Sequence, residues 1–247
     1  MPNVPAGVAS SRSEKNDDVC FGARRVGRRM VLEPCGEVSQ GEATRRCCAD
    51  SDGLGERSHL LNPEIDLETH ILDVVNMMKW QELRDVVLVG HSYGGMVASG
   101  VAERMEKSIA SIVMLDAFFP ADGQRLVDLL PAPQREAITK AAQDGATALP
   151  PMPAATVNLN DNDRVWFNAK ATPQPIKSVL QPSKLTGARD RIAKRTYIRA
   201  LDYPSVSFDA GISEARKKEW RIMEIAGGHI VMLDEPAQLT EMLVQLA

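Results

Sequence analysis

Short apolar runs alternate with longer amphipathic segments along most of the chain. The apolar runs predict strands at residues 85–89, 111–116, 196–201 and 221–225. The amphipathic segments predict helices at residues 67–80, 96–106, 209–219 and 236–246, and in the first of them Leu67, Ile71 and Val74 recur at helical spacing. This alternation is typical of an α/β domain with a parallel sheet and crossover helices.

The alternation of apolar runs and amphipathic segments is interrupted between residues 118 and about 195. This stretch is rich in proline and in polar clusters such as "LPPMPAAT" and "NLNDND". It follows a strand, and ligands of open α/β sheets bind beyond the carboxyl ends of the strands, so we interpret it as an inserted cap over that edge. The alternative is a loose surface excursion without a role.

The first 53 residues do not show this alternation of apolar runs and amphipathic segments. Segments such as "SSRSEKNDD" and "SQGEATRRCCADSDG" show neither strand alternation nor a helical stripe. By itself this composition predicts a disordered or non-native segment at 1–53. The α/β domain is then expected at 54–247, with its first strands missing or disordered.

Composition narrows the classes of ligand. The net charge of −4 provides no basic surface for nucleic acid, and the apolar stretches are too short for a membrane span. The N-terminus has no apolar signal region, which favours a cytoplasmic protein. The four cysteines all lie in the first fifth of the chain, and their spacing does not match a zinc site. A disulfide framework is not expected in a chain without a secretion signal. We therefore expect a small-molecule ligand and no metal, and we leave open whether the protein is a homodimer.

The stretch "GHSYGG", residues 90–95, follows a buried strand and precedes a helix. A serine in a glycine-rich turn can be an ordinary turn residue. Between a strand and a helix, however, Gly-x-Ser-x-Gly is typical of a nucleophile elbow. Ser92 would then be the nucleophile, and the backbone amide of Tyr93 would be an oxyanion donor.

A serine nucleophile needs a histidine base held by a carboxylate. Of the four histidines, His229 in "IAGGHIVMLDEP" has the right position, directly after the last strand. Asp202 ends the preceding strand and gives the chain order Ser, Asp, His, so it is our first choice of acid. Asp116, which ends an earlier strand, is the alternative. Asp209 is a third candidate, although it suits an N-cap better.

Several phrases carry a family resemblance: "GLGERSHLLNPEIDLETHILDVVN", "VVLVGHSYGGMV", "LDAFFPADGQ" and "GGHIVMLDEPAQL". With them the chain resembles the α/β-hydrolase superfamily, and within it the small esterases related to plant methylesterases, salicylate-binding esterase and hydroxynitrile lyases, with bacterial relatives that include a carbendazim-hydrolysing esterase. The resemblance implies the α/β-hydrolase fold, a helical cap over an apolar pocket, and serine esterase activity without a cofactor.

The family also implies an N-terminal strand followed by a loop "HGAW", whose backbone amide is the second oxyanion donor. The written sequence lacks both. Back-translation of residues 16–53 in a shifted reading frame can give "MTTFVLVHGAWxGGWCWSRVVKFLKAKPHxVVAPTLTG", in which the codons of Met30 and Val31 allow tryptophan alone. We therefore hypothesise that residues 1 to about 53 arise from a frameshift and that the chain with the present sequence lacks one of the two backbone amides of its oxyanion hole.

The resulting prediction is a serine hydrolase that cleaves a small carboxylic ester through an acyl-enzyme. Amide or carbamate hydrolysis would use the same residues. Hydroxynitrile lyase activity is disfavoured, because those relatives have a lysine after the catalytic histidine and this chain has Ile230. A non-catalytic binding protein is a further alternative. Aromatic candidates for the substrate pocket are Phe118, Phe119, Trp166 and Phe167.

Overall fold

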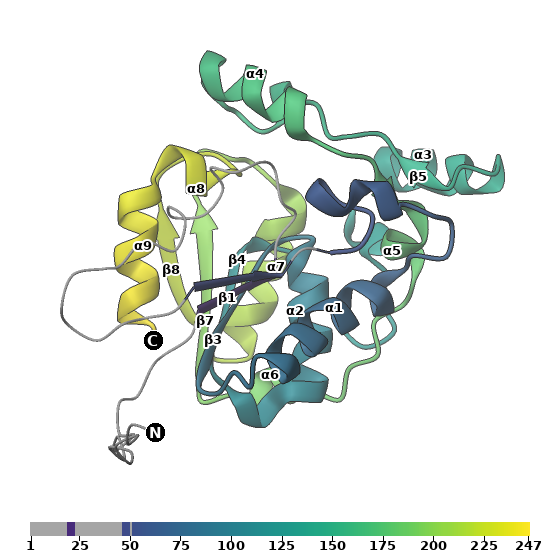
Figure 1. Cartoon of the computed structure of the whole chain (residues 1–247). Helices are drawn as coiled ribbons and strands as arrows, with labels where there is room; N and C mark the ends of the chain where they lie inside the picture. Colours follow the sequence, from purple (N-terminus) through teal and green to yellow (C-terminus); the bar gives the residue numbers. More distant parts are fainter. Residues whose placement is uncertain (1–18, 23–45, 50) are drawn as a thin grey trace, which may run out of the picture.

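The computed structural model describes residues 19–22, 46–49 and 51–247 of the chain. Their main feature is a 6-stranded parallel sheet in the order β2-β1-β3-β4-β7-β8 (Figure 1). The strands are β1 (Val19–Gly22), β2 (Arg46–Ala49), β3 (Val86–Ser92), β4 (Ile109–Ala117), β7 (Lys194–Ala200) and β8 (Arg221–Ile225). Parallel strands place all their carboxyl ends at one edge, and this edge carries the predicted chemistry.

The four predicted helices are all present. They are α1 (Leu67–Trp80), α2 (Gly94–Met105), α7 (Val206–Lys217) and α9 (Pro236–Gln245). The α1 helix has the predicted bounds, because the Asp66 side chain accepts a hydrogen bond from the Thr69 amide and caps its first turn. The α7 helix begins three residues earlier than predicted, because Ser205 caps it in place of Asp209.

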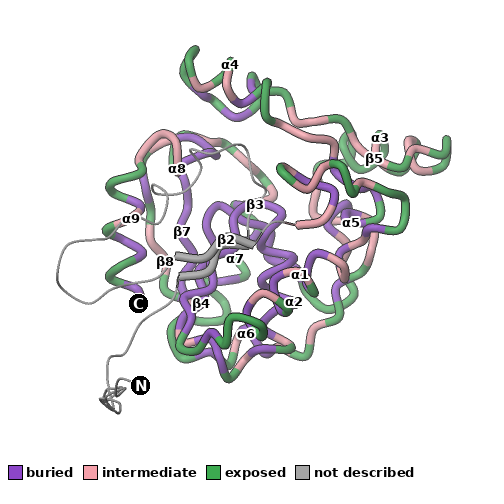
Figure 2. Tube along the Cα trace, in the orientation of Figure 1, coloured by how far each residue is buried: buried purple, intermediate pink, exposed green. Residues whose placement is uncertain are grey.

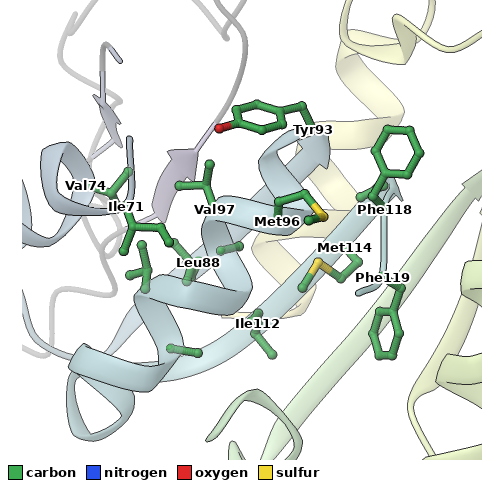
Figure 3. Close-up of a cluster of buried hydrophobic side chains, with 14 of the residues drawn as sticks. Ile71, Val74, Leu88, Tyr93, Met96, Val97, Ile112, Met114, Phe118 and Phe119 are labelled. Atoms are coloured by element: carbon green, nitrogen blue, oxygen red, sulfur yellow. The ribbon is translucent and has the colours of Figure 1, made fainter. Parts of the chain in front are cut away.

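Alternate residues of the strands face two apolar layers, as the pleat of a strand requires. In β3, Leu88 packs in the layer that includes α1, α2 and Phe208 of α7, whereas Val87 packs in the layer that includes Leu239 of α9. The interior is shown as the purple trace in Figure 2, and part of the first layer is drawn in Figure 3. The sheet is thus buried on both faces, which explains the nearly continuous apolar runs of its strands.

The N-terminal segment requires a correction. We expected the first strands to be missing or disordered, yet β1 and β2 lie within residues 1–53 and pair in parallel, β1 against both β2 and β3. Strand pairing uses backbone groups that every residue except proline possesses, so it does not depend on a side-chain pattern. Our other expectations for residues 1–18, 23–45 and 50 lie outside the described residues.

A helical cap is inserted between β4 and β7. Its elements are η3 (Leu126–Leu129), α3 (Ala132–Gln143), β5 (Ala148–Leu149), η4 (Ala154–Thr156), α4 (Asp161–Lys170), β6 (Gln174–Pro175), α5 (Ile176–Leu180) and α6 (Ala188–Arg191). In Figure 1, α3 and α4 lie at the top, on the side toward which the arrow of β8 points. The cap therefore extends from the edge of the sheet at which the strands end.

Leu126, Ile176 and Val179 of the cap pack in the main core, whereas the part of the cap with η4 and α4 contacts the domain through a small apolar cluster of its own. Ala154, Val157, Leu159 and Phe167 of the cap pack with Ile230, which follows β8. We call this group the cap cluster. It joins the cap to the segment that contains His229. Across the part of the chain that the structure describes, the helices are too short or too polar to cross a membrane.

Candidate active site

Ser92 ends β3 in a backbone conformation that is rare for a residue with a side chain. Its φ angle is 54°, in the left-handed region, and α2 begins two residues later. A β-carbon on Gly90 would lie 2.6 Å from the carbonyl oxygen of Gly94, so only glycine fits at this position. The structure therefore has the sharp strand-to-helix turn that defines a nucleophile elbow.

Ser92, His229 and Asp116 form one chain of hydrogen bonds at the carboxyl edge of the sheet. The Ser92 hydroxyl lies 2.9 Å from Nε2 of His229, and Nδ1 of His229 lies 2.6 Å from Oδ2 of Asp116. An ionised carboxylate can only accept, so Nδ1 carries the proton and Nε2 can accept the serine proton. All three residues are buried. This is the arrangement of nucleophile, base and orienting acid in a serine hydrolase.

Asp116 lies in a fully buried position, and it divides its two oxygens between two sets of partners. Oδ2 accepts from His229, whereas Oδ1 accepts from Nη1 of Arg199 at 2.6 Å and from the amide of Ala200 at 3.3 Å. Burial raises the pKa of the Asp116 carboxyl to about 6, against the opposing effect of the Arg199 guanidinium. The charge on this carboxylate therefore depends on the cation beside it.

The structure does not bring Asp202, our first choice of acid, to the imidazole. The Asp202 carboxylate accepts a hydrogen bond of 2.8 Å from the amide of Gly227, and the Asp202 amide donates to the Gly227 carbonyl at 3.0 Å. Asp209, the third candidate, is 64 % exposed and forms an ion pair with Arg199. Because β4 and β7 are neighbours, Asp116 and Asp202 reach the same edge, and it is Asp116 that meets His229.

Aromatic rings surround the imidazole of His229. Tyr203 and Phe208 lie nearly parallel to it, with centroid distances of 4.7 and 5.0 Å. His91 of the elbow lies 4.6 Å away, and its Nε2 donates to the carbonyl oxygen of His229 at 2.7 Å. These contacts restrict the orientation of the ring, as the base of a triad requires.

Tyr93 follows Ser92 and is the N-cap residue of α2, which places it where the predicted oxyanion amide belongs. Its hydroxyl lies 2.8 Å from Nδ1 of His70, and Nε2 of His70 lies 3.0 Å from the carbonyl oxygen of Asp52. Burial lowers the pKa of His70. The shifted-frame loop that would supply the second amide corresponds to residues 23–26, outside the described residues.

The four aromatic pocket candidates pack in two places. Phe118 and Phe119 are buried in the main core, where Phe118 contacts Phe208 edge-on at 5.1 Å. Phe167 is buried in the cap cluster, and Trp166 packs against that cluster. A role in binding substrate stays a prediction for all four. Ile230, the residue that replaces the lyase lysine, is buried in the cap cluster.

Comparison with known proteins identifies the family. The model of the "Alpha/beta hydrolase family" matches residues 38–242, and the chain belongs to that family. Among its relatives is the "Carbendazim hydrolyzing esterase" of Nocardioides sp. (strain SG-4G), which is 37% identical over 205 residues, covering 78% of this chain and 84% of the relative.

Solved structures share the fold at low sequence identity. An extracellular α/β-hydrolase from a Paenibacillus species, described as a structural and functional homologue of tobacco salicylic acid binding protein 2, has a TM-score of 0.72 at 23% identity, over 83% of this chain and 88% of the other. A variant of tomato methylketone synthase I, complexed with beta-ketoheptanoate, has a TM-score of 0.68 at 16% identity, over 96% and 98% of the two chains. The α/β-hydrolase fold with its parallel sheet, predicted from the sequence, is thereby confirmed.

Our prediction from the sequence did not include Arg199 and ranked Asp116 below Asp202. Two signals point to both residues. Asp116 interrupts the apolar run "SIVMLDAFF", and Arg199 interrupts the neighbouring strand "TYIRA". Two buried charges of opposite sign on adjacent strands are most simply explained as partners, because a lone buried charge is costly.

Proposed function

We propose that this protein is a serine hydrolase that cleaves small carboxylic esters, with Ser92 as nucleophile, His229 as base and Asp116 as acid. The observation that carries the proposal is the continuous hydrogen-bond chain from the Ser92 hydroxyl through His229 to Asp116. The family and the esterase relative support the same reaction class.

In the proposed reaction, His229 takes the proton of Ser92 as its oxygen attacks the ester carbonyl. Asp116 stabilises the imidazolium that forms, and the Tyr93 amide donates to the oxyanion. His229 then returns the proton to the departing alcohol, which leaves an acyl-enzyme on Ser92. Water, deprotonated by the same histidine, releases the acid and restores the free enzyme.

The second oxyanion amide is assigned by the frameshift hypothesis, which we carry forward as part of the proposal. The positions of β1 and β2 support it: at residues 19–22 the shifted frame reads "FVLV" where the written chain has "VCFG", and at 46–49 it reads "VVAP" where the written chain has "RCCA". Apolar runs rich in valine suit the strands of a parallel sheet. Resequencing the gene across codons 16 to 57 tests this part directly, and an unaltered frame there would reject it.

Two other activities belong in the assay. Amide or carbamate hydrolysis needs the same three side chains, and the relative named for carbendazim makes that compound a sensible substrate to include. Hydroxynitrile lyase activity is disfavoured because the Ile230 side chain, in the position of the lyase lysine, is buried among apolar side chains and carries no amine. A ligand-binding relative without catalysis is the remaining alternative.

The test compares hydrolysis of p-nitrophenyl acetate and butyrate by the wild-type chain and by Ser92→Ala. We expect turnover by the wild type and a loss of about 10⁶-fold in kcat in the variant, because the residues of the triad act as a unit. Ser99→Ala is the matched control, since Ser99 is a buried serine of α2 whose hydroxyl donates to the Gly95 carbonyl and accepts from Nη1 of Arg189, away from His229. Equal turnover by wild type and Ser92→Ala would reject the proposal, and ligand binding without turnover in either would favour the non-catalytic alternative.

A further inference from the structure

Arg199 contacts the acid of the proposed triad, and its guanidinium makes several other polar contacts. Nη1 donates to Asp116 and to the carbonyl of Ala200, both at 2.6 Å, and Nη2 donates to the carbonyl of Tyr203 at 2.8 Å. Nε and Nη2 also reach Oδ1 of Asp209, at 3.1 and 2.9 Å. The guanidinium is therefore fixed in one orientation by partners on three sides.

The two carboxylates that Arg199 contacts differ in their surroundings. Asp116 is 0% exposed, whereas Asp209 is 64% exposed. An exposed ion pair is worth little because water and salt screen it. A buried carboxylate that loses its cationic partner, in contrast, either takes up a proton or turns away from its remaining partner. Of the two ion pairs of Arg199, the one with Asp116 is therefore the one whose loss should have a large effect.

The direction of the Arg199–Asp116 contact matters for His229. Arg199 occupies Oδ1 of Asp116, so Oδ2 is the oxygen left for the imidazole. Apart from Arg199, the described contacts of Oδ1 consist of the longer bond from the Ala200 amide. Loss of the guanidinium would leave the carboxyl group with little to hold its plane or its charge.

We propose that Arg199 is a positioning residue of the triad, which keeps Asp116 charged and directed at His229 without touching the substrate. The inference rests on the proposed function, since it takes Asp116 as the triad acid. A neutral carboxyl group in this position could not stabilise an imidazolium.

The charges around Asp116 determine the sign of the expected pH effect. Burial already raises its pKa to about 6, and the groups that oppose this are the Arg199 guanidinium and His91 of β3. The other titratable groups that face the pair are His229, the hydroxyls of Tyr197 and Tyr203, and Asp209 beyond Arg199. Removing the cation raises the pKa of the coupled Asp116–His229 pair, so the acid limb of the pH profile moves to higher pH.

The experiment measures kcat/KM for p-nitrophenyl butyrate from pH 5 to pH 9 in Arg199→Gln, Arg199→Lys and the control Asp209→Asn. We expect Arg199→Gln to lose about 10²-fold at pH 7, within the range of general acid–base effects, and to recover part of the loss at pH 9. Arg199→Lys keeps the positive charge and should keep the acid limb in its wild-type position. Asp209→Asn cuts the exposed ion pair and should leave the profile unchanged.

Several outcomes would overturn the inference. An unshifted acid limb in Arg199→Gln, with wild-type thermal unfolding, would show that the guanidinium does not act through the charge of Asp116. If Arg199→Gln does not fold, Arg199→Lys decides, because a shifted acid limb in that variant contradicts the role of the charge. Asp116→Asn is measured beside them: full activity in that variant would reject Asp116 as the acid, whereas an inactive Asp116→Asn with unaltered Arg199 variants rejects the positioning role alone.

Discussion

The two sides of Ser92 come from different parts of the chain, and they differ in how well the sequence explains them. The acid–base side, formed by Asp116, Arg199 and His229, belongs to residues after Gly53, where apolar patterning and structure agree. The oxyanion side, as we propose it, combines the Tyr93 amide with a segment before Gly53, whose residues show neither strand alternation nor a helical stripe. A catalytic serine needs both sides, so the same elbow can be well equipped for proton transfer and poorly equipped to stabilise the oxyanion.

After that of Ser92→Ala, the largest expected effect tests the acid–base side. Asp116→Asn should lower kcat by about 10⁴-fold, because an amide leaves the imidazole in the wrong tautomer and cannot stabilise the imidazolium. Asp202→Asn is the matched control, since its carboxylate contacts the Gly227 amide and not the imidazole. Steady-state kinetics with p-nitrophenyl butyrate measure both. A large loss in Asp202→Asn alone would return the acid role to Asp202.

The next effect tests the oxyanion side. A chain in which residues 16–53 are replaced by the shifted-frame sequence, with glycine at its two unspecified positions, should gain about 10²–10³-fold in kcat, the value of one oxyanion donor. The same replacement combined with Ser92→Ala is the control. An unchanged kcat in a folded replacement chain would mean that the segment before Gly53 supplies no second amide.

A smaller effect concerns the contact between the cap and the acid–base side. Ile230→Ala removes the residue through which the cap cluster reaches the segment of His229, and it should lower stability by about 2–4 kcal/mol. Urea unfolding and limited proteolysis of residues 150–170 measure the change. Val165→Ala is the control, because Val165 of α4 is 73% exposed. Equal protease sensitivity in both variants would argue against Ile230 as the link.

The smallest effect is a pH dependence of stability. The pKa of Asp116 is raised by burial to about 6 from an ordinary value of 3.8. Between these two values the native state retains a proton that the unfolded state has released, so wild-type stability relative to Asp116→Asn should fall as the pH rises from 4 to 6. Urea unfolding midpoints of both proteins at pH 4.5 and 6.5 provide the measurement. A difference that does not change with pH would contradict the raised pKa.

Much of the fold was predictable because local signals and packing agree after Gly53. The bounds of α1 follow from its cap at Asp66, and the elbow follows from the glycines around Ser92. The choice between Asp116 and Asp202 was not predictable from position, because both residues lie at the ends of adjacent parallel strands. In the structure, the direction of the side chains decides between the two aspartates. In the sequence, the charge of Arg199, on the strand that precedes Asp202, is the signal that favours Asp116.

The β1 and β2 strands, in contrast, could not be predicted from the residues of the chain. A strand of four residues without alternation gives no signal in the sequence. In the structure, β1 is defined by its backbone pairing with β3 and β2 by its pairing with β1. The written residues there do not predict a strand, whereas those of the shifted frame do. The disagreement between pattern and structure therefore falls on the segment that the frameshift hypothesis concerns.

The central claim is that Ser92 is a nucleophile activated by His229. The most direct measurement is reaction of the folded protein with a p-nitrophenyl phosphonate, followed by mass spectrometry of its peptides. We predict one adduct per chain, on Ser92, forming at least about 10³-fold more slowly in His229→Ala because the serine then lacks its base. An adduct elsewhere with Ser92 unmodified, or equal rates in wild type and His229→Ala, would contradict the claim.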